Sequence, residues 1–566
     1  MTSSRVVPFG DSALLVTTAD VASAHALAGR VTHADPATAP VTVDEVVVGF
    51  TSVLLVLDLE PAGPAGAGPD PAGVDLDEVV AWLGRLATGT AGGDRPSTEA
   101  TTHVLAVTFD GPDLDEVAEA TGMAVDAVVD LLLGADLEVA FVGFAPGFPY
   151  LTGLPDALAA LPRRATPRTS VPAGSVAVAG GFASVYPRAT PGGWNLLGRS
   201  AAPLFDPHRR PHSRMSPGDR VRFVIDRSPP DRPVEDEAPR ALLGDDGHRA
   251  LVVVEPGLLD LVQDAGRQGA AAMGVPRAGA ADGDALALVN LLLGNHPAAA
   301  VVESTGAGPR LRVVGDAHLA VVGAGPGSVD VSIDGHPVPD ATVVPVADGQ
   351  VVSVGRIRRG LRAYVGVAGG LETPRLLGSR SSDVLSGLGP GRLRAGDRLA
   401  RGAPGRVRGT LDRPAATPAG ATVLRVLPGP HLAGAGSGSD AVERLAAMPW
   451  RVGARVDRVG VRLEPVGHRG PWCGGPVAST PMVTGAVQLP PDGHPIVLLP
   501  DHATVGGYPV VACVITADLP LLGQLAPGDA VAFVAVDRTA AERARRLRSD
   551  ARAAAVSGWF PTAAGT

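Results

Sequence analysis

Two short stretches of the sequence carry acidic and histidine side chains at spacings that suit proton transfer. Leu204-Phe-Asp-Pro-His208 contains the first pair, and Leu499-Pro-Asp-His502 contains the second. A carboxylate and an imidazole in one site can orient each other and exchange a proton with a substrate. Closeness in sequence does not prove closeness of the reacting atoms. The candidate catalytic residues are Asp206, His208, Asp501 and His502.

Paired glycines recur near these residues. Gly192-Gly193-Trp194 precedes the first acidic pair, and Gly506-Gly507-Tyr508 follows the second. Glycine lets a ligand approach the backbone closely, and neighbouring N–H groups can form an anion-binding nest without lysine. Arg168 and Arg199 flank the first glycine pair and can add two-pronged contacts to a carboxylate or phosphate.

A loop rich in aromatic residues lies in the first half. Phe144-Ala-Pro-Gly-Phe-Pro-Tyr-Leu151 follows a predicted strand, and its prolines and glycine fix a tight turn that presents Phe148 and Tyr150. The loop either plugs a barrel end or forms the aromatic wall of a ligand pocket. The predicted substrate-binding residues are Arg168, Ser170, Gly192, Gly193, Trp194, Arg199, Phe148, Tyr150, Asp264, Arg267, Gln488, Thr504, Gly506, Gly507 and Tyr508.

These residues also have a structural interpretation. Asp264 and Arg267 can pair with each other, the glycines can serve as turn residues, and the arginines can form surface salt bridges. No stretch has a metal-ligand spacing such as His-Glu-x-x-His, and no Gly-x-Ser-x-Gly elbow is present. Metal ligands therefore stay unassigned.

The chain contains no lysine, because all 48 of its basic residues are arginine. A complete Walker A loop needs its lysine on the phosphates, so no such loop exists here. Schiff-base chemistry through a lysine of this chain is excluded. Biotin is attached through a lysine amine, so this chain carries no biotin of its own.

The net charge, the hydropathy and the cysteine content limit the classes of partner and the cellular location that we expect. The net charge of -10 repels phosphate backbones, which argues against nucleic acid as a partner. No apolar run approaches the roughly 20 residues that span a bilayer, so we expect no membrane association. The first residues do not resemble a signal peptide, and two cysteines are too few for a disulfide framework. We expect a cytoplasmic protein, and a homo-oligomer is compatible with its β-rich surface.

Short valine-rich strands between glycine and proline turns predict a mainly β fold with some α, built from sandwiches or barrels. Helical spacing appears at 75–86, 113–120 and 124–133, and Asp282 is a good N-cap for a helix at 284–293. Residues 61–75 and 89–100 have the composition of insertions, and an arginine- and alanine-rich tail follows residue 540.

A weak repeat links the two halves. Thr190-Pro-Gly-Gly-Trp194 is followed by Pro217-Gly-Asp-Arg-Val-Arg-Phe223, and Thr504-Val-Gly-Gly-Tyr508 is followed by Pro527-Gly-Asp-Ala-Val-Ala-Phe533. The same turn chemistry at similar spacing predicts related barrel units in the two halves.

The long motifs resemble a known pair of families. Phe9-Gly-Asp-Ser-Ala-Leu-Leu-Val16, the 144–151 loop and the 167–199 stretch resemble the B subunit of 5-oxoprolinase, also known as the sporulation-kinase inhibitor or allophanate-hydrolase subunit 1 family. Val262-Gln-Asp-Ala-Gly-Arg267, Leu377-Gly-Ser-Arg-Ser-Ser382 and 501–509 resemble the C subunit, whose family is similar to biotin-dependent carboxyltransferases. The resemblance covers about nine-tenths of the chain.

The resemblance implies a cyclophilin-like β-barrel in each half. It divides the chain into a small α+β subdomain at 1–100, a barrel at 101–228, a linker at 229–249, a part like the C subunit with two barrel-like lobes at 250–540 and a helical tail at 541–566. Ala503 stands where the family usually has glutamine, and the stretch Phe109-Asp-Gly-Pro-Asp-Leu114 is shortened. An amide contact and a glutamate of the family pattern are therefore missing.

The implied activity is ATP-dependent opening of 5-oxo-L-proline to L-glutamate, with Mg²⁺ as cofactor and with the separate A subunit of 5-oxoprolinase as partner. The same pair of families also forms the carboxyltransferase region of urea carboxylase, so a carboxyltransferase that uses a biotin carrier in trans is an alternative. A non-catalytic regulator of a histidine kinase is a third. In both enzymatic interpretations the substrate is a small amide or lactam.

Overall fold

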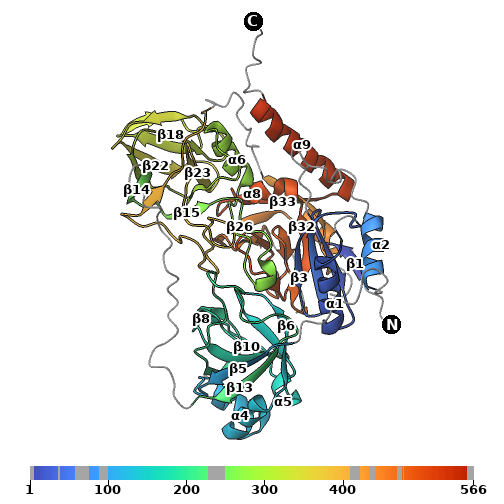
Figure 1. The fold of residues 1–566 in the computed structure, drawn as a ribbon. Helices are drawn as coiled ribbons and strands as arrows, with labels where there is room; N and C mark the ends of the chain where they lie inside the picture. The colour runs from blue at the N-terminus through green and yellow to red at the C-terminus, as the bar shows by residue number, and fades with distance from the viewer. Residues whose placement is uncertain are drawn as a thin grey trace.

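The computed structural model describes residues 5–35, 38–57, 76–87, 100–226, 249–407, 421–431, 440–467, 475 and 477–557. These residues form a small α+β unit and three β-rich bodies (Figure 1). The predicted class, mainly β with some α, is confirmed. The predicted linker and insertions fall almost entirely outside the described residues.

The N-terminal unit is a four-stranded antiparallel sheet, ordered β1-β2-β4-β3, with two helices. Alternating apolar residues on β2 and β4 bury Leu14 and Leu55 against Leu27 and Trp82 of the helices. Asp20 caps the first helix by accepting a hydrogen bond of 2.7 Å from the Ser23 N–H. The elements are β1 (Arg5–Pro8), β2 (Ala13–Thr17), α1 (Val21–Thr32), β3 (Val43–Val48), β4 (Ser52–Leu57) and α2 (Leu76–Ala87).

The first barrel, residues 102–225, has the strand order β12-β9-β10-β7-β6-β13-β5. A bridge between Thr108 and Arg199 joins its two ends. A separate ribbon pairs β8 with β11. The strands are β5 (Thr102–Val107), β6 (Leu137–Val142), β7 (Pro149–Thr152), β8 (Arg168–Val171), β9 (Ser175–Ala179), β10 (Phe182–Val185), β11 (Thr190–Gly192), β12 (Asn195–Arg199) and β13 (Arg220–Ile225), and the helices are α3 (Leu114–Thr121), α4 (Val125–Leu133) and α5 (Asp156–Ala159).

The middle body consists of two sheets ordered β20-β19-β22-β17-β14-β24 and β15-β16-β23-β18-β21. Helix α6 (Gly283–Leu292) begins where predicted, because Asp282 accepts hydrogen bonds from the N–H groups of Asp284 and Ala285. The other elements are β14 (Ala250–Glu255), β15 (Leu259–Gln263), η2 (Ala271–Met273), β16 (Val301–Thr305), β17 (Arg310–Val314), β18 (Ala317–Val322), β19 (Val329–Ile333), β20 (His336–Val338), β21 (Val344–Val346), β22 (Val351–Ile357), β23 (Arg362–Val367) and β24 (Arg398–Ala400).

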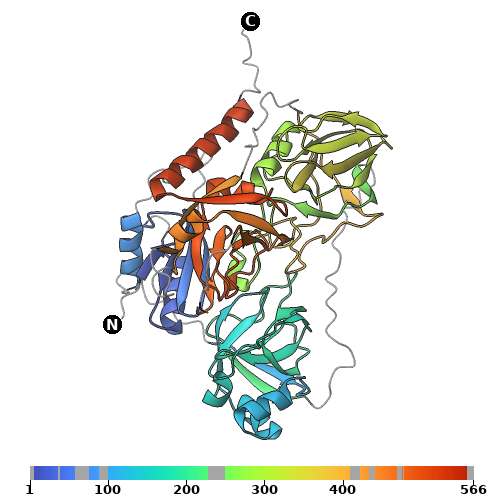
Figure 2. The ribbon, with the colours of Figure 1, turned by 180° about the vertical axis from the view of Figure 1, so that it is seen from behind.

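The C-terminal barrel is closed, in the order β25-β32-β29-β30-β27-β26-β33, and a ribbon pairs β28 with β31. Helix α9 lies along the outside of this body (Figure 2). The elements are β25 (Thr422–Pro428), α7 (Asp440–Ala447), β26 (Trp450–Val456), β27 (Gly460–Pro465), β28 (Thr480–Pro481), β29 (Ala486–Gln488), β30 (Ile496–Leu498), β31 (Val505–Gly506), β32 (Val510–Val514), η3 (Thr516–Asp518), α8 (Leu519–Leu522), β33 (Ala530–Ala535) and α9 (Arg538–Ser557).

The first and C-terminal barrels share one topology. Read from the first strand, β5-β12-β9-β10-β7-β6-β13 has the same succession as β25-β32-β29-β30-β27-β26-β33. In both barrels the first and last strands pair in parallel. Each barrel also carries a ribbon, β8 with β11 and β28 with β31, and the two predicted Gly-Gly turns fall on these ribbons. The topology agrees with the repeat found in the sequence.

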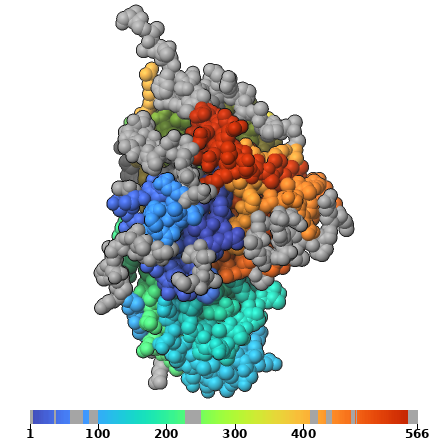
Figure 3. All heavy atoms as spheres, turned by 90° about the vertical axis from the view of Figure 1, so that its right-hand side faces the viewer, coloured from blue at the N-terminus to red at the C-terminus, as the bar shows by residue number. Residues whose placement is uncertain are grey.

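The N-terminal unit packs on the C-terminal barrel, so the two halves of the chain interlock (Figures 1 and 3). Phe9 and Leu54 share an apolar cluster with Met482 and Cys513. Buried Asp11 accepts hydrogen bonds from the Thr516 N–H and from its hydroxyl, at 3.0 and 2.7 Å. None of the described helices has both the length and the apolarity needed to cross a membrane.

Candidate functional site

The two Gly-Gly ribbons meet where the first barrel contacts the C-terminal barrel. Phe148, Tyr150, Tyr186 and Trp194 of the first barrel form one apolar cluster with Val505 of the C-terminal barrel. The ring of Phe148 lies 5.0 Å from Tyr186 and 5.6 Å from Trp194, both edge to face. This geometry is favourable for aromatic pairs. We call this contact, together with the adjoining residues 488 and 504–507, the junction.

The 143–148 loop turns tightly, and its glycines permit close contacts. A Cβ on Gly143 would lie 2.8 Å from both γ-methyl groups of Val505, so a larger residue would push the barrels apart. Gly147 has a positive φ of 72°, and its N–H donates to the Met273 carbonyl at 2.9 Å. The loop thus holds Phe148 buried against the C-terminal half.

Two buried tyrosines supply polar groups on the first-barrel side of the junction. Burial raises the pKa of Tyr150 to about 12 and raises that of Tyr186 further, while the nearby charge of Arg163 acts in the opposite direction on both pKa values. Both hydroxyls are therefore protonated at neutral pH and can donate hydrogen bonds. A Cβ on Gly192 would lie 2.3 Å from the Tyr186 hydroxyl, so glycine is needed there.

On the other side of the junction, Gln488 and Thr504 have polar atoms to offer. The hydroxyl of Thr504 is buried and has no hydrogen-bond partner among the described residues. Among the residues that the structure describes, the amide nitrogen of Gln488 reaches only the sulfur of Met482, at 3.5 Å. A Cβ on Gly506 would lie 2.5 Å from that nitrogen. A buried donor without a partner costs free energy, so a ligand that satisfies these groups would gain affinity.

Asp501 and His502 lie next to the junction but are held differently. Asp501 is fully buried and pairs with Arg458, at 3.0 Å from Nε and 2.7 Å from Nη2. His502 is buried, which lowers its pKa, and its Nδ1 lies 2.8 Å from the Ala503 carbonyl. A neutral ring with its proton on Nδ1 leaves Nε2 as a proton acceptor. The catalytic roles of both residues stay predictions.

Asp264 and Arg267 hold one segment of the chain between them instead of forming an ion pair. The Asp264 carboxylate accepts 2.6 Å hydrogen bonds from the hydroxyls of Ser379 and Ser381, and Arg267 donates from Nη2 to the Ser381 carbonyl. Arg267 is buried, and its Nε and Nη1 have no partner among the described residues. Their predicted part in substrate binding stays untested.

The other predicted residues lie away from the junction or are engaged elsewhere. Arg168 pairs with buried Asp113 at 2.5 Å, and Arg199 pairs at 2.8 Å with Asp110, both half exposed. Among the remaining residues, Ser170 is exposed on β8, His208 is exposed, and the His208 N–H donates to the Asp206 carboxylate at 2.8 Å. Tyr508 is 42% exposed beside the second glycine pair.

Several residues at or near the junction were not predicted. Arg458 lies in the stretch Asp457-Arg-Val-Gly460, which also resembles the C subunit, and Tyr186 lies in the 167–199 stretch, but neither residue was assigned a role. Arg163 and Asp383 have no motif of their own. Burial, followed by the charge of Asp501, raises the pKa of Asp383 to about 6. Arg163 lies in Leu161-Pro-Arg-Arg164, directly before the predicted 167–199 segment, and this position was the feature of the sequence that could have indicated it as a site residue.

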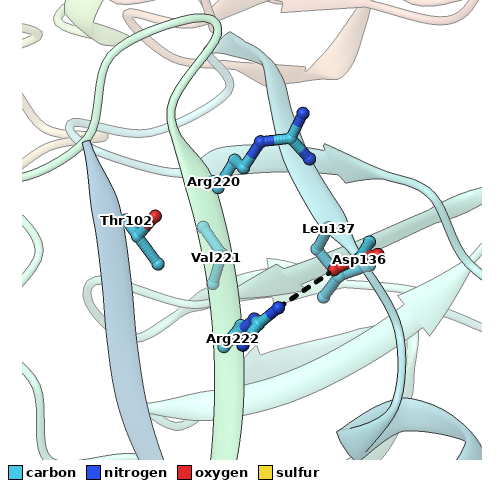
Figure 4. Close-up of a pocket in the computed structure, with 6 residues that line it drawn as sticks. All are labelled: Thr102, Asp136, Leu137, Arg220, Val221 and Arg222. Carbon is cyan, nitrogen blue, oxygen red and sulfur yellow. Dashed lines mark ion pairs between the residues drawn. The ribbon is translucent and has the colours of Figure 1, made fainter. Parts of the chain in front are cut away.

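A cavity of about 410 Å³ lies beside the first residues of β5, β6 and β13 in the first barrel (Figure 4). Arg222 and Asp136 pair across it at 3.5 Å, and both side chains are exposed. Screening by water makes such a pair weak. None of its lining residues belongs to the junction, so we do not regard this cavity as the functional site. Among the described residues, no group of three or more His, Cys, Asp or Glu side chains is placed to hold a metal.

Comparisons with known proteins agree with this architecture. Residues 4–215 match the family described as carboxyltransferase domain, subdomain C and D, and residues 273–535 match carboxyltransferase domain, subdomain A and B. The crystal structure of TTHA0988 superposes with a TM-score of 0.78 at 35% identity, and the match covers 92% of this chain and 99% of that one.

Relatives match the two parts of the chain separately. The C subunit of 5-oxoprolinase from Escherichia coli K12 is 34% identical over 301 residues, which cover 52% of this chain and 94% of that protein. The B subunit from Escherichia coli O157:H7 is 52% identical over 114 residues, or 20% of this chain and 52% of that protein. The urea amidolyase of Lachancea kluyveri is 30% identical over 333 residues, covering 54% of this chain but 18% of that enzyme. The chain belongs to the carboxyltransferase-domain family of the B and C subunits of 5-oxoprolinase and joins both types in one polypeptide.

Proposed function

We propose that the chain is a component of an ATP-dependent 5-oxoprolinase that opens 5-oxo-L-proline to L-glutamate together with the separate A subunit of that enzyme. The observation that carries this proposal is the junction. The region that matches carboxyltransferase domain, subdomain C and D, supplies Tyr150 and Tyr186, and the region that matches subdomain A and B supplies Gln488 and Thr504. A site made by both parts gives a physical reason for their union in one chain.

The groups at the junction suit an amide or lactam. In the proposed reaction the protonated hydroxyls of Tyr150 and Tyr186 donate hydrogen bonds to the substrate and hold its amide group in position. Gln488 and Thr504 orient the amide group by hydrogen bonds. Neutral His502 is the candidate proton acceptor for the water that attacks the carbonyl carbon. When bound, ATP would supply a phosphoryl group to the carbonyl oxygen and leave as ADP. Water would then add to the carbonyl carbon, and the C–N bond would break to give the amine, the carboxylate and inorganic phosphate.

Arg168 and Arg199, the predicted anion contacts, do not form a phosphate site by themselves. Asp113 neutralises Arg168, and Arg199 pairs with Asp110 at the surface. We therefore propose that ATP and Mg²⁺ are held with the help of the A subunit, and we assign no phosphate contact to these two residues.

Turnover by the purified chain tests the proposal. The chain is incubated with ATP, Mg²⁺ and 5-oxo-L-proline, with and without the A subunit, and L-glutamate and phosphate are measured together. We expect both products, in equal amounts, only in the complete mixture. Phosphate without glutamate, or no turnover at all, would sink the proposal.

The match to urea amidolyase favours a second candidate, transfer of carboxylate from a biotin carrier to urea. This chain has no lysine to carry biotin, so the carrier would act in trans. Loss of carboxylate from a carboxylated biotin carrier, dependent on urea and on this chain, would establish that reaction instead. Tight binding of a histidine kinase without any turnover would favour the regulatory alternative.

A further inference from the structure

A loop of the first barrel brings a cation to the edge of the junction. The loop at 161–167 is fixed by its backbone: the Leu161 carbonyl accepts from the Gly180 N–H, and the Arg164 N–H donates to the Gly193 carbonyl, both at 2.7 Å. The second bond ties the loop directly to the first glycine pair. Arg163 therefore has a defined position beside that pair.

Arg163 differs from the other arginines of this region in its partners. Arg164 pairs with Asp113 at 2.8 Å and with Glu116 at 2.7 Å, and Arg168 pairs with Asp113 at 2.5 Å. Arg163 is exposed and forms no hydrogen bond or ion pair with any residue that the structure describes. Its charge therefore remains available to a ligand.

The guanidinium of Arg163 lies across the junction. A Cβ on Gly507, in the C-terminal barrel, would lie 3.6 Å from its Nη1 and 4.0 Å from its Nη2. The same charge is felt at the hydroxyls of Tyr150 and Tyr186 in the first barrel. Arg163 thus stands between the two glycine ribbons, with the tyrosine hydroxyls within its electrostatic reach.

We propose that Arg163 binds a carboxylate of the substrate, so that the junction selects amides or lactams that carry a negative charge. This inference rests on the proposed function and adds a specificity residue to it. A guanidinium can hold a carboxylate with two parallel hydrogen bonds. 5-Oxo-L-proline has such a group next to its lactam ring, whereas 2-pyrrolidinone and urea have none. A preference for 5-oxo-L-proline over the same ring without the carboxylate therefore reports recognition of that carboxylate.

The test compares two ligands that differ only in the carboxylate. 5-Oxo-L-proline and 2-pyrrolidinone, the same lactam ring without the carboxylate, are titrated calorimetrically into the full chain, alone and mixed with the A subunit. The variants are Arg163→Gln, Arg163→Lys and, as the matched control from the same loop, Arg164→Gln.

We expect the natural chain to bind 5-oxo-L-proline about tenfold to hundredfold more tightly than 2-pyrrolidinone, which is the usual gain from a charged hydrogen bond. Arg163→Gln should abolish this preference without weakening 2-pyrrolidinone binding. Arg163→Lys should restore part of it, and Arg164→Gln should keep it. Circular dichroism of each variant checks the fold.

The inference is overturned if Arg163→Gln keeps the preference, if the natural chain binds both ligands equally, or if it binds neither. Its failure is distinct from failure of the proposed function, which is scored by glutamate formation. Arg163-dependent binding without glutamate would refute the 5-oxoprolinase reaction and support the carboxylate site. Glutamate formation with an unchanged KM in Arg163→Gln would do the reverse.

Discussion

Arg458 is the residue whose replacement should affect stability most. It is fully buried between the middle body and the C-terminal barrel, and it bonds Asp501, Glu303 and the Gly279 carbonyl. In Arg458→Met the volume is nearly kept, but two buried carboxylates lose a partner. Glu303 keeps only Arg362, whose Nε lies 3.5 Å away, as an ion-pair partner among the described residues. Removing one member of a buried ion pair costs about 3–5 kcal/mol.

That cost should be visible as a lower melting temperature. In a body of roughly 150–250 residues, each kcal/mol shifts Tm by about 2–4 °C, so we expect a decrease of about 10 °C by scanning calorimetry at neutral pH. The matched control is Arg358→Met, which breaks an exposed, water-screened pair with Asp330 in the middle body and should leave Tm nearly unchanged.

The stability difference between the natural chain and Arg458→Met should also depend on pH. Burial raises the pKa of Glu303, but the charges of Arg458 and Arg362 outweigh it and leave this pKa below its usual value. A lowered carboxyl pKa adds stability above the ordinary pKa of glutamate, and that stability is lost as pH falls through the lowered value. The gap between the natural chain and Arg458→Met should therefore be widest near neutral pH and narrow in acid. Equal Tm values for Arg458→Met and Arg358→Met would refute this reasoning.

Two further predictions concern the junction and its surroundings. Gly506→Ala places a Cβ 2.5 Å from the Gln488 amide nitrogen, so it should lower kcat/KM for glutamate formation about tenfold with the fold kept. In Gly507→Ala the new Cβ meets no atom closer than 3.6 Å, so kcat/KM in the same assay should stay near the natural value. Asp383→Asn removes a carboxyl whose pKa is raised to about 6 by burial and then by Asp501. A raised pKa favours the fold when the acid is protonated, and this advantage is lost as pH rises through about 6. About one pKa unit of the shift lies above pH 5, so the variant should gain about 1.4 kcal/mol on the natural chain between pH 5 and pH 8. Parallel denaturation curves at the two pH values would contradict that expectation.

Local features of the fold could be predicted because the sequence contains their causes. The Asp282 cap and the apolar spacing after it predicted α6, and the paired Thr-x-Gly-Gly turns predicted the shared barrel topology. The packing of the N-terminal unit could not be predicted, because the alternation that buries Leu54 does not say which surface covers it. The structure places it against Met482, which is far along the chain in the C-terminal barrel.

The site was predictable in part for the same reason. The aromatic loop and the glycine pairs are local motifs, and the structure brings Phe148 and Trp194 into one cluster with Val505. The state of each charge depends on partners far along the chain. Asp113 appeared in the sequence only at the start of a helix, but it neutralises Arg168. Arg163, one position from a paired arginine, is distinguished only by its surroundings.

Glutamate formation tests the central claim most directly. L-Glutamate and phosphate are quantified after 5-oxo-L-proline and ATP are incubated with the natural chain, with the A subunit and with both together, and the complete mixture is repeated with Gly192→Val and Gly506→Val. If the site spans both parts of the chain, both products form only in the complete mixture, and a bulky residue in either ribbon abolishes them while the fold is kept. Full activity with either ribbon blocked, or urea-dependent consumption of carboxylated biotin carrier in place of glutamate, would contradict the account.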